Sequence, residues 1–417
     1  MKVLFVATTF PIPPHAGASV ALLETLKSIE DLCELHLLVP ISEENSEADM
    51  ARLQQIVPHT LVHFYKARGP HLAPLQKYTA AARSALSGGS YHATIWTDQN
   101  LRQATSDLTS LRHFDIVHCE WLYPAVSLRT LNLPLVVRTL DLHAALMNEG
   151  LEHVSQNMSA LRKTFWKVET ERFRQFELNV LNHTLLTIAV SSEDEAMLRR
   201  EGLANVVVIP PPMTLPERTN SASHNGSCVA LFLCALHLDI NREAAFIFMD
   251  EIWPKLSEQV RSRVQVIFAG GRPADELRRK AEECGVQVQA PLPDEQARIL
   301  YDNCDIFLSP VTTGTGIKTK ALEAMANAKP MVGFPNSFRG IHLESGKHAL
   351  VANSNDEFAV MFEQLVWDSA LRKQVGEAAR GFIHSHFNPQ TLGHQLLDTY
   401  ASVSGFGQRR AAAGQRH

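Results

Sequence analysis

The segment of residues 309–330, SPVTTGTGIKTKALEAMANAKP, constrains the fold of this chain more than any other. A short apolar run at residues 305–308 leads into a loop rich in Gly and Thr. Strong helix formers follow, from about Ile317 to Ala326. A buried strand, a Gly-containing loop and a helix form, in this order, the turn at which doubly wound α/β domains bind ligands. We therefore expect a domain of this kind around the segment.

The loop and the first helical turn have the chemistry of a phosphate site. Gly314 and Gly316 allow backbone conformations that other residues avoid, and they let a ligand approach closely. The unpaired N–H groups and the positive dipole end of the following helix favour an anion. Lys318 and Lys320 add positive charge in the expected first turn.

Glu323 lies about one turn further along the expected helix and suits a sugar. An ionised carboxylate accepts two hydrogen bonds at once, so Glu323 is a suitable partner for a pair of sugar hydroxyls. Phosphate at the loop with a ribose diol beside it describes a nucleotide site. The alternative is a Gly-containing turn with Glu323 solvated on a surface helix, and for a lone Gly-x-Gly that alternative is preferred. The order of Thr, Lys and Glu in this segment favours the nucleotide site.

The same segment resembles the donor-site signature of the family 4 retaining glycosyltransferases, which have the GT-B fold. In that family a Glu, seven residues and a second Glu precede an Ala-Met-Ala run, a small residue, Pro and a β-strand. Residues 322–326 and 329–332 match this order, with Glu323 as the second Glu. Thr315 stands where the family has its first Glu.

The resemblance implies two Rossmann-like doubly wound domains facing across a cleft, with a C-terminal helix that crosses back to the N-terminal domain. It also implies a retaining transfer of a sugar from a nucleotide-sugar donor to a glycan, lipid-linked or other acceptor. Such a transfer belongs to bacterial-type polysaccharide or glycoconjugate biosynthesis. The sequence has no Asp-x-Asp motif, so neither a catalytic metal nor a cofactor is implied, and the nucleotide sugar is a co-substrate.

Site residues follow from the resemblance. The family often carries His and then Asp after the strand that here ends near Arg138, whereas this chain has Leu140, Asp141 and a His only at position 143. The residues expected to take part in catalysis are Asp141, His143 and Lys318. The expected donor contacts are Gly17, His237, Arg242, Gly314, Thr315, Gly316, Ile317, Lys318 and Glu323. The expected acceptor contacts are Glu120, Glu149 and His153.

Two groups of donor contacts have open alternatives. The family places a Gly after its first strand, facing the donor phosphates, and Gly17 either has that role or is only a turn residue. The family also tends to hold the diphosphate with a Gly, an Arg and a Lys after the first strand of its second domain. Here that segment reads ALHLDINR, in which His237 and Arg242 are the candidate substitutes.

Length and composition agree with a two-domain soluble enzyme. A chain of 417 residues exceeds one ordinary core. The hydrophobic share of 45% and the charged share of 20% are those of globular proteins. A net charge of -5 and an isoelectric point near 6.4 argue against a general nucleic-acid binder.

The cysteines, the N-terminus and the hydropathy indicate a cytoplasmic protein. Six cysteines are scattered without a Cys-x-x-Cys pair, so we expect buried reduced thiols. The N-terminal run MKVLFVATTF has no small-residue cleavage site and is typical of a first strand. No apolar stretch approaches the roughly 20 residues that span a bilayer.

Alternating apolar and helical segments set the expected domains. Apolar runs at residues 2–8, 34–39, 61–65, 116–119, 135–138 and 185–190 are separated by helical patterns, as in a parallel sheet. A polar stretch at residues 214–227 marks the boundary. We predict an N-terminal acceptor domain at 1–213, a donor domain at 226–388, a returning helix at 389–404 and a disordered tail at 405–417.

A basic, partly apolar stretch at residues 66–83 has two interpretations. Lys66, Arg68, Lys77 and Arg83 lie among Leu, Ala and Tyr, a pattern that fits a peripheral contact with anionic lipid at the inner face of the membrane. A solvated amphipathic helix explains it as well, and we favour that interpretation.

Two rival functions stay open. One is a nucleotide-sugar epimerase of the GT-B fold, which releases no transferred product. The other is a non-catalytic relative that binds a nucleotide or a partner, suggested by Leu140 and Thr315 in place of the family's usual residues. The sequence sets neither the sugar, the base, the acceptor nor the oligomeric state.

Overall fold

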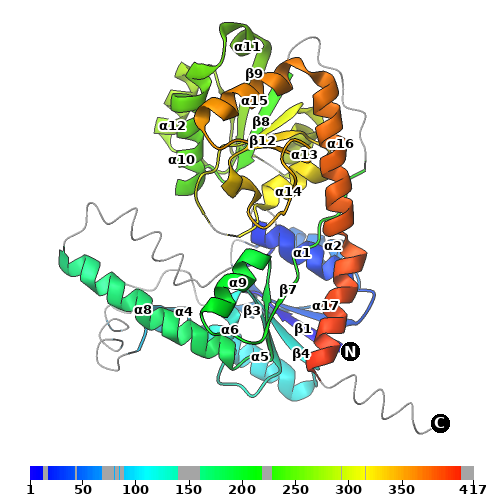
Figure 1. Cartoon of the computed structure of the whole chain (residues 1–417). Coiled ribbons are helices and arrows are strands. Elements are labelled where there is room, and N and C mark those ends of the chain that lie inside the picture. Colours follow the sequence, from blue (N-terminus) through cyan, green and yellow to red (C-terminus); the bar gives the residue numbers. More distant parts are fainter. Residues whose placement is uncertain are drawn as a thin grey trace. The chain divides into compact units, whose positions relative to one another are not determined.

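The computed structural model describes residues 1–12, 17–42, 45–67, 79, 84, 89–139, 160–217, 228–292, 294–314 and 316–404. Within these residues the chain forms two compact units, each built on its own parallel sheet (Figure 1). Unit 1 groups residues 1–12 and 25–211 with the C-terminal segment from Gln390. Unit 2 groups residues 212–389 with residues 17–24. The predicted α/β class with two parallel sheets is confirmed.

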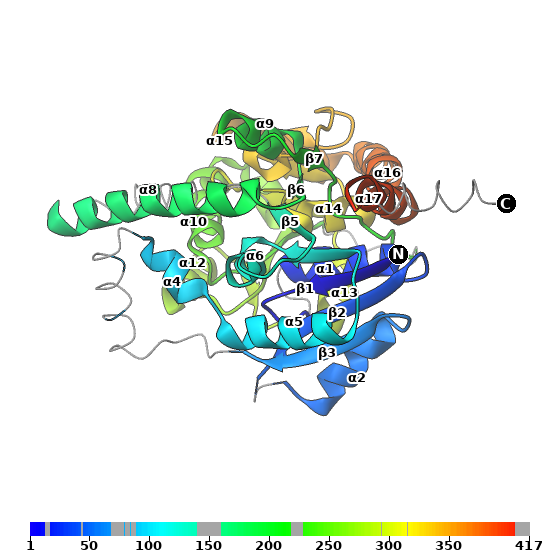
Figure 2. The same cartoon turned by 90° about the horizontal axis from the view of Figure 1, so that it is seen from below.

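The sheet of unit 1 has seven strands in the order β3-β2-β1-β4-β5-β6-β7, with β3 at one edge (Figure 2). Every pairing is parallel. The inner strands are mostly apolar because helices cover both faces of such a sheet, although β4 and β5 also carry buried polar side chains. The strands are β1 (Lys2–Val6), β2 (Glu34–Ile41), β3 (Leu61–Lys66), β4 (Ile116–Glu120), β5 (Leu135–Thr139), β6 (Leu186–Ala189) and β7 (Val206–Val208).

The helices of unit 1 alternate with these strands. Helix α9 has an acidic first turn and a serine N-cap, where Ser191 accepts a hydrogen bond from the Asp194 amide. Helix α4 packs against the long helix α8 (Figures 1 and 2). The helices are α1 (Gly17–Ile29), whose residues 17–24 group with unit 2, α2 (Glu47–Ile56), α4 (Tyr91–Trp96), α5 (Gln99–Leu111), α6 (Leu122–Leu128), α8 (Ala160–Asn182), α9 (Ser192–Arg200) and α17 (Pro389–Val403).

The sheet of unit 2 has six parallel strands in the order β10-β9-β8-β11-β12-β13. Alternate residues of β8 face two separate cores, because successive strand side chains point to opposite faces. Ala230 and Phe232 face one core, and Val229 and Leu231 the other. The strands are β8 (Cys228–Cys234), β9 (Val264–Gly270), β10 (Gln287–Gln289), β11 (Ile306–Ser309), β12 (Met331–Gly333) and β13 (Leu350–Val351).

The helices of unit 2 include one irregular segment. Helix α10 (Asp239–Ile247) does not continue as a regular α-helix but passes into a π-helical turn and then a 3-10 turn. Pro254 explains the change, since it has no N–H for the carbonyl one turn earlier and its ring crowds that carbonyl. The other helices are α11 (Glu258–Arg263), α12 (Asp275–Glu283), α13 (Asp294–Asn303), α14 (Thr319–Ala326), α15 (Asn355–Trp367) and α16 (Ser369–His386).

Three general expectations can be compared with the described residues. All six cysteines are free thiols, four of them buried and two half-buried. None of the described helices combines the length and apolar character of a membrane span. The predicted disordered tail, 405–417, and most of the basic stretch at 66–83 lie outside the described residues.

Candidate functional site

The loop between β11 and α14 carries most of the predicted donor contacts. Helix α14 begins at Thr319, two residues later than expected, so Ile317 and Lys318 belong to the loop rather than to the first turn. Lys318 is the N-cap, and its side chain makes no capping hydrogen bond. The N–H groups at the start of α14 therefore keep their capacity to bind an anion.

The two glycines of this loop have backbone conformations that suit glycine. Gly314 has φ of 98° and Gly316 has φ of 68°. A β-carbon at Gly314 would lie 3.0 Å from Ile240 Cδ1 and 3.3 Å from Lys318 Nζ. The loop is therefore narrow at Gly314, with an aliphatic side chain and an ammonium group beside it.

Lys318 lies over its own loop. Its Nζ donates to the carbonyl oxygen of Gly316 at 3.4 Å and is close to Gly314. The ammonium group, the loop backbone and the N-terminus of α14 are thus gathered in one place. Together they provide positive charge and donors for an oxyanion.

Glu323 is held by two neighbours, and its side chain is 16% exposed. Lys320 Nζ donates to its two carboxylate oxygens at 3.0 and 2.9 Å. The hydroxyl of Tyr301, on α13, donates to Oε2 at 3.0 Å. Burial, and then the charge of Glu323, raise the pKa of Tyr301 well above its usual value, so this phenol stays protonated as a donor.

Gly17 is the first residue of α1, and the described contacts place it beside the start of α14. A β-carbon at Gly17 would lie 2.3 Å from Thr319 Oγ1, so a larger residue needs the neighbour to move. Gly17 and Thr319 both belong to unit 2. This close approach requires glycine, and the sequence alone did not indicate it.

His237 lies beside Gly271, and Arg242 pairs with Asp239. His237 is exposed, and its Nδ1 lies 2.5 Å from where a β-carbon at Gly271 would be. Arg242 Nη2 pairs with Asp239 Oδ1 at 2.8 Å on the surface. Between these residues, the side chain that approaches Gly314 is that of Ile240.

Glu120 does not face solvent, in contrast to its predicted contact with an acceptor. It is 1% exposed and lies within 3.5 Å of both His118 and Arg138. Position in the sequence placed Glu120 correctly at the carboxyl end of a strand, but it did not show that its side chain points into the unit. The other acceptor contacts, Glu149 and His153, lie outside the described residues, as do Asp141, His143 and Thr315.

Reasoning from the sequence missed Tyr301 and Ile240. Tyr301, in α13, bonds to Glu323, and Ile240, in α10, lies beside Gly314, but no spacing in the sequence links either residue to residues 314–323. Only the fold brings them together.

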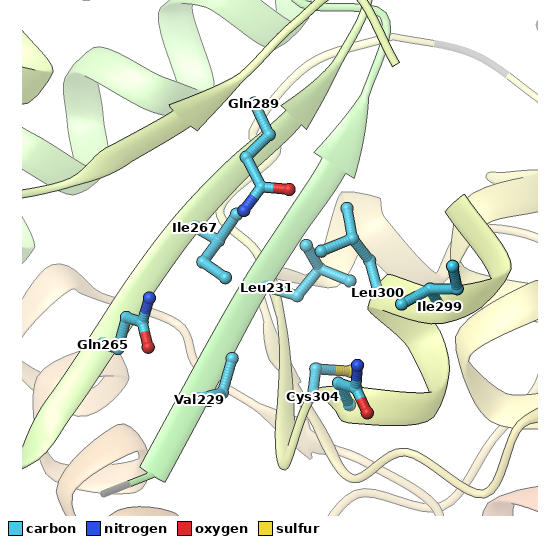
Figure 3. A pocket seen from close by; sticks show the side chains of 9 residues that line it. Val229, Leu231, Gln265, Ile267, Gln289, Ile299, Leu300 and Cys304 are labelled. Atoms are coloured by element: carbon cyan, nitrogen blue, oxygen red, sulfur yellow. The ribbon is translucent and has the colours of Figure 1, made fainter. Parts of the chain in front are cut away.

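A pocket of about 280 Å³ lies in unit 2, between α13 and the strands β8, β9 and β10 (Figure 3). Aliphatic side chains such as Leu231, Ile267 and Leu300 line it, together with the amides of Gln265 and Gln289. None of the predicted site residues lines this pocket. Among the described residues there is also no cluster of His, Cys, Asp and Glu arranged for a metal ion.

Comparison with known proteins gives one matching family model. Residues 227–368 match the model of the glycosyl transferases group 1 family. Over 399 residues the chain is 21% identical to a 44.6 kDa protein of the cps region of Klebsiella pneumoniae. That alignment covers 94% of this chain and 97% of the relative.

Several solved structures share the fold at low sequence identity. Anabaena HepE, solved with UDP and glucose, has a TM-score of 0.66 at 16% identity, covering 96% of this chain and 100% of HepE. Sucrose-phosphate synthase of Thermosynechococcus elongatus has a TM-score of 0.71 at 13% identity, covering 96% and 98%. TarM of S. aureus has a TM-score of 0.70 at 10% identity, covering 96% and 99%. The chain therefore has the GT-B fold, and its residues 227–368 match the glycosyl transferases group 1 model.

Proposed function

We propose that this protein is a retaining glycosyltransferase that moves a sugar from a nucleotide-sugar donor, bound in unit 2, to a glycan or lipid-linked acceptor. The observation that carries the proposal is the β11–α14 loop, where Gly314, Gly316 and Lys318 meet the N-terminus of α14. Glu323 lies one turn further along the same helix. HepE has been solved with UDP and with UDP-glucose, which makes a uridine nucleotide the first donor to test.

The chemistry of the loop suits the difficult step of a glycosyl transfer, the departure of the diphosphate. The bond between the anomeric carbon and the diphosphate oxygen breaks, and negative charge develops on the leaving diphosphate. The ammonium of Lys318 and the N–H groups at the start of α14 are placed to stabilise that charge without a bound metal ion. This is the basis of the proposed metal independence.

Retention follows from attack on the face that the leaving group vacates. The acceptor hydroxyl oxygen bonds to the anomeric carbon, and its proton passes to an oxygen of the departing phosphate. Asp141 and His143, which follow β5, are the proposed side chains near the reacting sugar.

The proposed pathway is polysaccharide or glycoconjugate biosynthesis. The relative from a cps region supports this context. The proposed location is cytoplasmic, with the acceptor at the inner face of the membrane, because a charged nucleotide sugar does not cross a lipid bilayer readily.

Calorimetry with UDP and uridine tests the role of Lys318. In Lys318→Met we expect UDP to bind about 10- to 100-fold more weakly, the range for losing a hydrogen bond to a charged group, with uridine binding much less affected. Lys347→Met is the matched control, because Lys347 is an exposed lysine of unit 2 paired with Glu344. Equal losses for UDP and uridine, or no UDP binding to the wild type, would contradict this assignment.

Product analysis tests the reaction itself. We expect activity in EDTA and a first-formed product with the anomeric configuration of the donor, read by NMR. Activity lost on chelation and restored by Mg²⁺ would refute metal independence. An inverted product would refute retention. A converted nucleotide sugar without any acceptor would point to an epimerase.

A further inference from the structure

A chain of buried polar side chains crosses unit 1, and the proposed donor chemistry does not use it. The hydroxyl of Tyr400 lies 2.6 Å from His118 Nδ1, and His118 Nε2 lies 3.1 Å from Glu120 Oε2. Arg138 Nη1 lies 3.4 Å from Glu120 Oε1 and donates to Thr25 Oγ1 at 2.8 Å. These five side chains come from α17, β4, β5 and α1, and none is more than 1% exposed.

The protonation states of these side chains decide which group donates and which accepts in each hydrogen bond. Burial lowers the pKa of His118 although Glu120 opposes the effect, so the imidazole is neutral. Burial alone raises the pKa of Glu120, but Arg138 and His118 outweigh it and lower the pKa. The ionised Glu120 accepts from Nε2–H of His118, and Nδ1 of His118 is then left to accept from Tyr400.

This row of buried polar side chains lies at the carboxyl ends of β4 and β5. Glu120 is the last residue of β4, and it is in register with Arg138, the next-to-last residue of β5. Ligands of doubly wound sheets bind at the carboxyl ends of the strands. The side chains that hold Glu120 and Arg138 in place therefore also set the course of the backbone where it leaves β4 and β5.

Packing alone does not require a hydroxyl at position 400. Helix α17 already approaches α1 closely, since a β-carbon at Gly393 would lie 2.2 Å from the Ser28 carbonyl oxygen. The ring of Tyr400 packs against His118, which also stacks on Phe5 with ring centroids 4.2 Å apart. A phenylalanine would occupy the same space but would leave Nδ1 of His118 without its donor.

We propose that Tyr400 is a positioning residue that holds His118 in its Nε2–H tautomer, and through it Glu120 and Arg138, at the carboxyl ends of β4 and β5. The consequence for catalysis rests on the proposed sugar transfer. The consequence for the order of the strand ends does not rest on that transfer, so the two consequences are tested separately.

Amide hydrogen exchange tests the structural part in the full-length chain. In Tyr400→Phe we expect faster exchange at residues 116–120 and 135–139 than in the wild type. Ser402→Ala is the control, because Ser402 is exposed on the same helix and bonds only within it, to the Thr399 carbonyl at 2.7 Å. Exchange in Tyr400→Phe equal to that in Ser402→Ala would overturn the proposal whatever the protein's activity.

Steady-state kinetics tests the catalytic part. In Tyr400→Phe we expect kcat to fall at least about tenfold, because small displacements of reacting groups slow reactions strongly. The KM for the nucleotide sugar should stay within about twofold, since the donor site lies in the other unit. A fall in melting temperature with unchanged kcat would show that Tyr400 serves stability alone and would overturn its role in catalysis.

A second variant tests the other end of this row of polar side chains, at Thr25. Thr25→Val keeps the side-chain shape but removes the oxygen that accepts from Arg138. The proposal expects the same pattern of exchange and kinetics, concentrated at residues 135–139. Failure of nucleotide binding in the wild-type protein would refute the proposed function while leaving the exchange result to decide the role of Tyr400.

Discussion

The carboxylate of Glu323 has partners on both oxygens before any ligand arrives. Lys320 contacts both oxygens and Tyr301 contacts one of them. A carboxylate accepts about four hydrogen bonds, so two sugar hydroxyls compete with Lys320 more than with Tyr301. Binding of a ribose is therefore expected to draw Lys320 away from Glu323 while Tyr301 keeps the carboxylate in place.

The first prediction concerns Glu323 itself. Glu323→Gln should weaken UDP binding by about 1–3 kcal/mol, because hydrogen bonds to a charged acceptor are lost. The fold should persist, because α14 packs through its buried apolar residues. Calorimetry with UDP is the measurement.

A matched control for Glu323 exists in the same unit. Glu344 also pairs with a lysine three residues away, Lys347, but both side chains are largely exposed. Glu344→Gln should leave UDP affinity unchanged. If Glu323→Gln behaves like Glu344→Gln, Glu323 does not bind the nucleotide.

Individual residues also show which features of the candidate site the sequence can predict and which it cannot. Gly314, Gly316, Lys318 and Glu323 were predicted as site residues because they lie close together in the sequence, where their combined chemistry is apparent. The burial of Glu120 depends on Arg138, 18 residues away, and on His118, which is held in turn by Tyr400 from 282 residues away. Side chains that meet only through tertiary packing leave no local signal.

Among the elements, α14 and α16 form a close contact behind the candidate site. A β-carbon at Gly376, in α16, would lie 2.1 Å from the carbonyl oxygen of Ala328, just beyond α14. Ala328 itself has a positive φ of 55°, where the chain turns out of the helix. This contact fixes α16 against the end of the helix whose start carries Lys318.

The second prediction compares two glycines of α16. Gly376→Ala should destabilise the protein by about 1–3 kcal/mol, because the new methyl group overpacks a backbone contact. Gly381→Ala should stabilise it by about 0.5–1 kcal/mol, because nothing lies within 4 Å and alanine favours the helix. Urea unfolding measures both, and equal effects would contradict the tight contact.

Element boundaries were predictable where the pattern was strong. The strands at residues 116–119 and 135–138 were predicted to within one residue, because apolar runs are local. The late start of α14 and the π-helical turn after α10 were not predicted. Both depend on how the backbone satisfies its hydrogen bonds around a lysine N-cap and around Pro254.

For the whole molecule, the two units have separate cores. Among the described residues, clusters of buried apolar side chains lie within unit 1 and on both faces of the sheet in unit 2. Separate cores permit separate unfolding transitions. A ligand that binds only one unit stabilises that unit by mass action.

The third prediction uses the tryptophans. With Trp253 and Trp367 replaced by Phe, the remaining tryptophans, Trp96, Trp121 and Trp166, all report on unit 1. UDP at about 100 times its Kd should stabilise unit 2 by about 2.7 kcal/mol and leave the tryptophan-detected transition unshifted. Circular dichroism reports on the helices and strands of both units, so it should show the shifted transition of unit 2. Coincident transitions that move together would show that the units unfold as one.

The grouping of α17 with unit 1 has a consequence for synthesis on the ribosome. Unit 1 contains the first residues of the chain and also those after Gln390, so its last helix emerges only when all of unit 2 has been made. Until then His118, which stacks on Phe5, lacks the ring of Tyr400, and an apolar face of the first sheet stays open to water. Nascent chains that stop short of Tyr400 are therefore expected to be clients of chaperones, because exposed apolar surface promotes aggregation.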